Sequence, residues 1–236
     1  MARKPSEPSD QHPTLPSPTK SDREKIIEAF MALLAERPFE KIGFADIAAR
    51  AGLTLAQCRA EFSATIRVLA AHVAEIDRKV LAGSTPDMAE EPPRERLFDV
   101  LMRRLEALAP HRAAIRSLAR SVARDPALGM AVNGMAVRSQ QWMLTAADID
   151  AAGPRGLIRA QGLAVLYGRV LRVWLNDQDP GLARTLAALD RELGRGQRWA
   201  GFLDRMCRFL PRGAGRRSRR RYDDGGESHR DDPIMA

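Results

Sequence analysis

The chain has 236 residues, of which 44% are hydrophobic and 5% aromatic, and its formal net charge at pH 7 is +8. This length suits one or two domains, and the apolar fraction is sufficient for a buried core. No apolar run approaches the roughly 20 residues of a membrane-spanning helix. Ala, Leu and Arg dominate and no stretch shows the alternation typical of a strand, so the composition favours an all-α fold.

The N-terminal segment and the two cysteines indicate the compartment in which the protein works. Residues 1–20 are rich in proline and serine, and we expect them to be a disordered leader. They lack the apolar core of a signal peptide, so the protein is expected to stay in the cytoplasm. Cys58 and Cys207 lie far apart without metal-like spacing and are expected to be reduced thiols.

A first helix is predicted from Asp22, because Ser21 and Glu24 form a capping-box pattern. In this pattern the serine side chain holds the amide three residues on, and the glutamate reaches back. Apolar residues follow at steps of three and four, namely Ile26, Ile27, Phe30, Leu33 and Leu34. Pro38 ends the helix after about four turns.

The next segment has the pattern of a helix-turn-helix. A short helix is expected from Phe44 to Ala51, ended by Gly52 in the left-handed conformation. Thr54 is a good N-cap for a third helix, Leu55 to Phe62. If the pair docks on DNA in the usual way, the N-terminal residues of this third helix are aimed at base edges.

This stretch resembles the TetR family of transcriptional regulators. The matching residues are Phe39, Ile47-Ala48, Ala51-Gly52-Leu53-Thr54 and Phe62, and they cover about a quarter of the chain. The resemblance implies a TetR-like fold, in which an N-terminal three-helix module, residues 21–66, binds DNA. It also implies a larger helical ligand-binding and dimerisation domain, residues 67–196.

Five residues are the candidates for DNA contact, namely Thr54, Leu55, Gln57, Arg59 and Thr65. Gln57 and Arg59 are chemically able to read adenine and guanine edges. The chain departs from the family pattern, with Arg59-Ala60-Glu61 in place of an aromatic pair and Thr65 in place of a lysine. From Ser21 to Phe62 it has six basic and seven acidic residues, so a module that keeps its fold without reading DNA stays an alternative.

A long fourth helix, 63–81, is expected to act as a lever between the two domains. After a linker at 86–93, helices are predicted at about 94–109, 110–124, 126–147, 154–177 and 179–194. Proline near the start of several of them is compatible with this assignment, because a helix start needs no amide there. The TetR resemblance implies that 154–177 and 179–194 form the four-helix bundle of a homodimer.

A small apolar ligand is expected in the larger domain. Met130, Trp142, Met143 and Tyr167 are the candidates to line its cavity, because methionine and aromatic side chains form large, adaptable apolar walls. The alternative is that these are ordinary core residues.

Nothing in the sequence is typical of an active site. It has no nucleophile with its base, no glycine-rich phosphate loop and no paired acids. His72 and His111 lack carboxylate partners at metal-ligand spacing. We therefore expect a protein that is not an enzyme and has no catalytic residues, metal or cofactor.

A second resemblance covers the stretch from Trp174 to Leu193, which is similar to the end of the coenzyme Q biosynthesis accessory proteins that share the TetR fold. It implies lipid binding at a membrane surface. Residues 197–210 follow as an amphipathic helix and 211–236 as a disordered tail, first Arg-rich and then acidic, so that 198–221 could contact anionic lipid. The alternative is a final helix packed on its own domain.

Two functions therefore stay open. The first is a dimeric transcriptional regulator, a repressor that binds a double-stranded DNA operator and is released by a small apolar ligand. The second is a lipid-binding accessory protein of ubiquinone biosynthesis. The complete helix-turn-helix, with its Gly52 turn and Thr54 cap, favours the regulator.

Overall fold

The computed structural model of the protein describes residues 20–83, 88 and 90–209, with side chains described up to Gly196. All regular structure in this part of the chain is helical, which confirms the prediction of an all-α fold. None of these helices is long and apolar enough to cross a bilayer. The expected leader, the tail at 211–236 and the side chains of 197–210 lie outside the described residues.

The N-terminal module contains α1 (Asp22–Glu36), the short 3₁₀ turn η1 (Phe39–Lys41), α2 (Phe44–Ala51) and α3 (Leu55–Glu61). The predicted capping box at Ser21 is present: the Glu24 amide donates to Ser21 Oγ at 3.3 Å, and the Ser21 amide donates to the Glu24 carboxylate at 2.8 Å. The core of the module is apolar and closely packed. Its most buried side chains are Ile26, Phe30, Leu33, Leu34, Ile47 and Cys58.

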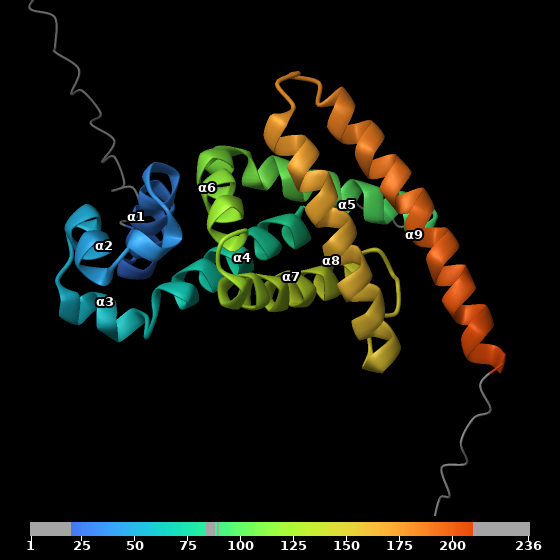
Figure 1. Cartoon of the computed structure of the whole chain (residues 1–236), viewed down its shortest axis with the longest axis horizontal. Helices are drawn as coiled ribbons and strands as arrows, with labels where there is room; N and C mark the ends of the chain where they lie inside the picture. Colours follow the sequence, from blue (N-terminus) through green and yellow to red (C-terminus); the bar gives the residue numbers. More distant parts are fainter. Residues whose placement is uncertain (1–19, 84–87, 89, 210–236) are drawn as a thin grey trace, which may run out of the picture.

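Helix α4 (Thr65–Ala82) belongs to both domains. Val68, Leu69 and Ala71, in its first half, join the core of the N-terminal module. Ile76 and Val80, in its second half, join the core of the larger domain. Figure 1 shows α4 running from the end of α3 into the larger domain, as expected for a lever helix. The boundary between the two cores therefore lies inside α4, and not at its start.

The larger domain is formed by the remaining elements. These are α5 (Pro93–Leu108), the 3₁₀ turn η3 (Ala109–His111), α6 (Arg112–Val122), α7 (Pro126–Ala146), α8 (Gly153–Asn176) and α9 (Ala183–Phe209). Helix α9 runs back along α8 (Figure 1). Trp174 of α8 and Leu189 of α9 are almost completely buried in this core, together with Leu101 and Leu105 of α5.

Helix α9 is continuous where two helices were expected. It passes through Gly194 and Gly196 without a break. Glycine weakens a helix but does not end one that tertiary packing supports. A Cβ atom at Gly196 would lie 3.3 Å from Leu166 Cδ1, so the glycine lets α9 approach α8 closely. The segment 197–210 is thus the last part of α9, up to Phe209.

Helix α6 joins the N-terminal module to the larger domain by packing. It lies against α1, and Ala114 is part of the core of the module. The Ser117 hydroxyl donates to the Arg37 carbonyl at 3.1 Å, and the Phe39 amide donates to Ser121 Oγ at 3.1 Å. The two domains are therefore connected twice, through the chain in α4 and through these contacts of α6.

Candidate nucleic-acid interface

The turn between α2 and α3 is tight, and Gly52 makes it possible. Gly52 has φ 67° and ψ 34°, in the left-handed region that favours glycine. The Leu53 amide then donates to the Ala48 carbonyl at 3.0 Å, which closes the end of α2. Both features confirm the predicted turn of a helix-turn-helix.

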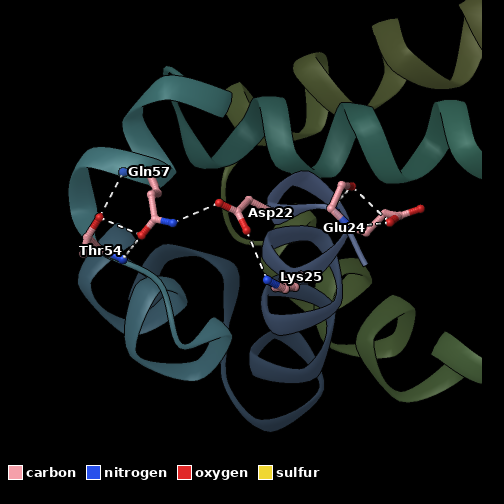
Figure 2. A network of polar contacts seen from close by, with 6 residues as sticks. Asp22, Glu24, Lys25, Thr54 and Gln57 are labelled. Carbon is pink, nitrogen blue, oxygen red and sulfur yellow. Dashed lines mark hydrogen bonds and ion pairs between the residues drawn. The ribbon is translucent and has the colours of Figure 1, made fainter. Parts of the chain in front are cut away.

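The start of α3 is held by a reciprocal capping box (Figure 2). The Gln57 amide donates to Thr54 Oγ1 at 3.2 Å. In return Gln57 Oε1 accepts from the Thr54 amide and from the Thr54 hydroxyl, each at 2.9 Å. Thr54 is therefore the N-cap, as predicted, and its hydroxyl is used within the fold.

Helix α3 is tied to α1 at both of its ends. At its start, Gln57 Nε2 donates to Asp22 Oδ2 at 3.0 Å, and the other oxygen of Asp22 accepts from Lys25 at 3.1 Å (Figure 2). At its end, the Arg23 guanidinium lies 4.6 Å from the ring centroid of Phe62. The Gln57 side chain, predicted as a base reader, is thus engaged in three hydrogen bonds that position the helix.

The outer face of α3 is mostly apolar. Leu55 is 58% exposed, a high value for a leucine. Ala56, Arg59 and Ala60 are exposed as well, whereas Cys58 is completely buried. No described residue forms an ion pair or hydrogen bond with Arg59. The helix therefore presents one free guanidinium among small and branched apolar side chains.

Thr65 is the first residue of α4 and is half-buried beside the end of α3. Two positions later, Arg67 is exposed and has no partner among the described residues. Sequence reasoning treated the absence of a lysine at Thr65 as a loss of phosphate contact and missed Arg67. The signal that could have revealed it is a basic residue two positions after Thr65, within the same predicted helical turn.

Most charges of the module are paired with each other. Five ion pairs with separations of 2.6–3.7 Å link Lys20 with Glu28, Arg23 with Glu61, Lys25 with Asp22, Arg37 with Asp46, and Arg50 with Glu36. These pairs are solvent-exposed and contribute little to stability. They leave Lys41, Arg59 and Arg67 as the cations of the described module and the start of α4 that carry no partner.

The four residues predicted to line a ligand cavity are not gathered in one place. Met143 and Tyr167 are buried in the core of the larger domain. Met130 and Trp142 are 77% and 58% exposed, on the outer surface of α7. The helical period placed hydrophobic residues on α7 but did not show which face of α7 meets its neighbours.

A buried polar cluster lies beside Tyr167 and was not predicted. Arg104 of α5 forms an ion pair with Asp77 of α4, and both side chains are almost fully buried. The Ser139 hydroxyl of α7 donates to Asp77 Oδ1 at 2.7 Å. The Arg104 guanidinium lies 5.7 Å from the Tyr167 ring, and burial raises the pKa of the Tyr167 phenol. Four helices therefore meet around one buried charge pair.

Helix α6 also holds the end of α8. Arg112 donates to the Trp174 carbonyl and, at 2.9 Å, to the Asp177 carbonyl, and its guanidinium lies 4.5 Å from the Trp174 ring. Arg116 donates to the Leu175 carbonyl. Carbonyls at a helix C-terminus lack partners within their own helix, and cations are favourable there. Helix α6 thus links the last turn of α8 to the N-terminal module.

Solved structures share this arrangement of helices. A TetR transcriptional regulator from Nitrosomonas europaea ATCC 19718 matches with a TM-score of 0.60 and 22% identity, over 75% of this chain and 99% of the regulator. The chain has the fold of the TetR transcriptional regulators. Two regulators from Rhodococcus sp. RHA1 support this TetR-like fold. One, a TetR regulator, matches with a TM-score of 0.50 and 23% identity, over 74% of this chain and 95% of the regulator. The other, a transcriptional regulator, matches with a TM-score of 0.51 and 20% identity, over 76% of this chain and 97% of the regulator.

Comparison at the level of sequence gives no matching family or curated protein. No protein-family model matches the chain, and no curated protein matches it. The likeness to the three regulators therefore concerns the arrangement of helices. The local chemistry of the helix-turn-helix has to indicate the function.

Proposed function

We propose that the protein is a transcriptional regulator of the TetR type that binds operator DNA through α2 and α3. The observation that carries this proposal is α3 itself, a short helix with a capped start, an exposed outer face and an unpaired arginine. Each of these properties suits a recognition helix. Its N-terminal residues must project into the major groove, and its backbone must be fixed before contact.

The unpaired cations support the same conclusion. Lys41, Arg59 and Arg67 are free to meet phosphate or base edges, whereas the other cations of the module already have carboxylate partners. Phosphate neutralisation supplies much of the affinity of proteins for DNA. Because the described part of the module and the start of α4 have three free cations, one copy binds weakly, and two copies on a two-fold site are needed for a specific complex.

We place the second copy on α8 and α9. Leu157, Ile158 and Val165 of α8 are about half exposed in the single chain, and burial of such side chains favours association. A two-fold dimer presents two α3 helices to half-sites about one DNA turn apart or a multiple of it. This geometry suits a repressor that competes for a promoter.

Regulation by a small, largely apolar ligand is the finer part of the proposal. A ligand that enters the core near Met143 and Tyr167 meets α4, α5, α7 and α8 at the Asp77–Arg104 pair. Displacement of α4 there changes the position of the module, because α4 contributes to the cores of both domains. A coupling of roughly 1–3 kcal/mol is enough to change DNA affinity by 5- to 150-fold.

A shift titration tests DNA binding, using the DNA upstream of the gene itself and a scrambled fragment of equal length. The wild-type chain is expected to bind and shift the upstream fragment at a protein concentration at which the scrambled fragment stays unbound. Arg59→Ala should weaken this preference. Arg138→Ala is the matched control, since Arg138 is also exposed and without a partner among the described residues but lies on α7, away from α3 and from the proposed dimer face. Equal retention of both fragments by the wild type would contradict the proposal.

A further inference from the structure

The recognition helix has an unusual chemistry for reading bases, because Arg59 is its one exposed hydrogen-bonding side chain that is not engaged with another described residue. Leu55 and Arg59 lie four residues apart and therefore on one stripe of α3, and Ala56 and Ala60 form the adjacent stripe. We propose that α3 recognises its half-site through the 5-methyl group of thymine, contacted by Leu55, and a guanine, contacted by Arg59. This inference rests on the proposed function and specifies its DNA ligand.

Gln57 is excluded as a reader by the bonds that it already makes. Reading of adenine requires the amide oxygen and nitrogen of glutamine to face the same base edge. In α3 the oxygen of Gln57 faces Thr54, where it accepts two hydrogen bonds, and the nitrogen faces Asp22 (Figure 2). Release of this amide would break the side-chain half of the capping box at Thr54 and the hydrogen bond to Asp22 of α1. Gln57 is therefore a positioning residue.

Leu55 is the side chain that fits a methyl group. It is the first residue of α3 and is 58% exposed, so its branched end projects from the capped start of the helix. A leucine cannot form hydrogen bonds with base edges. Thymine is the base that presents a methyl group in the major groove, and apolar side chains contact it there. Burial of the two groups against each other removes apolar surface from water.

Arg59 supplies the polar contact of the same stripe. Its guanidinium has no partner among the described residues, so no ion pair must be broken before it donates to guanine O6 and N7. Four helical residues span roughly 6 Å along the axis of α3. Because base pairs are stacked about 3.4 Å apart, Leu55 and Arg59 meet bases within a few positions of each other. The half-site should therefore contain a thymine and a guanine that are close neighbours.

Base analogues test the two contacts separately in the full-length chain. Once a specific site has been selected from random DNA, each thymine is replaced in turn by deoxyuridine, which lacks only the methyl group. Affinity of the wild type should fall about fourfold at the contacted thymine, the effect of one buried methyl group. Leu55→Ala should bind the thymine-containing site with a similar loss of affinity. Its affinity should not change when deoxyuridine replaces thymine at that position.

Arg59→Ala is the matched variant for the second contact. It should keep the response to deoxyuridine and lose the response to 7-deazaguanine, which lacks the N7 acceptor. If specific binding is found but no deoxyuridine changes the affinity, or if Leu55→Ala responds to it like the wild type, the thymine assignment is wrong while the proposed function stands. If no sequence is selected from random DNA, both the inference and the proposed function fail.

Discussion

The imidazole rings of His72 and His111 meet edge to face, with their centroids 4.6 Å apart. His72 belongs to α4 and His111 to the 3₁₀ turn that leads into α6, so the contact joins the two helices that connect the domains. Burial, followed by the charges of His111, Lys79 and Arg104, lowers the pKa of His72 to about 4. Burial also lowers the pKa of His111.

The first prediction is that His72 makes the fold sensitive to acid. In the unfolded chain His72 has an ordinary pKa near 6.5, so the unfolded state binds the proton more tightly than the folded state. The stability contributed by neutral His72 is complete above pH 6.5 or so and is lost as pH falls toward 4, to a total of roughly 3 kcal/mol. His72→Leu should show a shallower decrease of the thermal midpoint over this range. Parallel curves for both proteins would contradict the assignment.

The second prediction concerns the buried pair of Asp77 and Arg104. Removal of one partner leaves the other charged and buried, so Arg104→Met should lower the free energy of unfolding by about 3–5 kcal/mol. The double variant, Arg104→Met with Asp77→Leu, should recover much of this loss because no uncompensated charge remains. Urea unfolding of the two variants measures the difference. Equal loss in both would show that the side chains act through packing alone.

The predicted parts of the fold are those determined by residues close together in the chain. The caps at Ser21 and Thr54 and the Gly52 turn depend on partners within about five positions, so their residue types revealed them. The bond between Gln57 and Asp22 joins residues 35 positions apart. Sequence reasoning placed Gln57 on α3 correctly but could not know that its amide faces α1.

Helix packing is the part that local patterns do not determine. Two helices, 179–194 and 197–210, were predicted where α9 is continuous. Close approach of α9 to Leu166 explains Gly196 without a break. Arg104 and Asp77 occupy inward positions of α5 and α4, and their burial depends on a partner in another helix. The candidate ligand residues also lie partly in the core and partly on the surface, because their burial depends on which face of α7 packs against other helices.

The third prediction compares two glycines that have open space around their Cα atoms. Gly52 has φ 67°, so Gly52→Ala should lower stability by about 1–2 kcal/mol through backbone conformation alone. Gly134 lies in the interior of α7, and Gly134→Ala should raise stability by roughly 0.5–1 kcal/mol. Thermal unfolding of both variants checks the opposite signs. Stabilisation by alanine at Gly52 would be incompatible with the left-handed turn.

The fourth prediction concerns the contact of α6 with the N-terminal module. Ser117→Ala leaves the Arg37 carbonyl without its partner, and Ser121→Ala does the same to the Phe39 amide. Each should reduce stability by about 0.5–1.5 kcal/mol, the net contribution of one hydrogen bond, because both bonds are only partly buried. Protection of the α1–η1 amides from hydrogen exchange should fall more than protection of α8. A uniform decrease in both regions would show that α6 does not link the domains locally.

The last prediction uses salt to separate phosphate contact from base contact. Arg67 lies in the first turn of α4 and Arg59 on the exposed face of α3, and neither has a partner among the described residues. Arg67→Ala should weaken binding to specific and to nonspecific DNA to a similar degree. It should also reduce the slope of log affinity against log salt concentration by about 0.9 for each phosphate that is no longer neutralised. Arg59→Ala should instead weaken mainly the specific site, because a base contact adds discrimination. Arg138→Ala on α7 should leave both measurements unchanged. If Arg67→Ala keeps the wild-type slope, the start of α4 does not touch the backbone, and Arg67 then does not compensate for the absence of a lysine at Thr65.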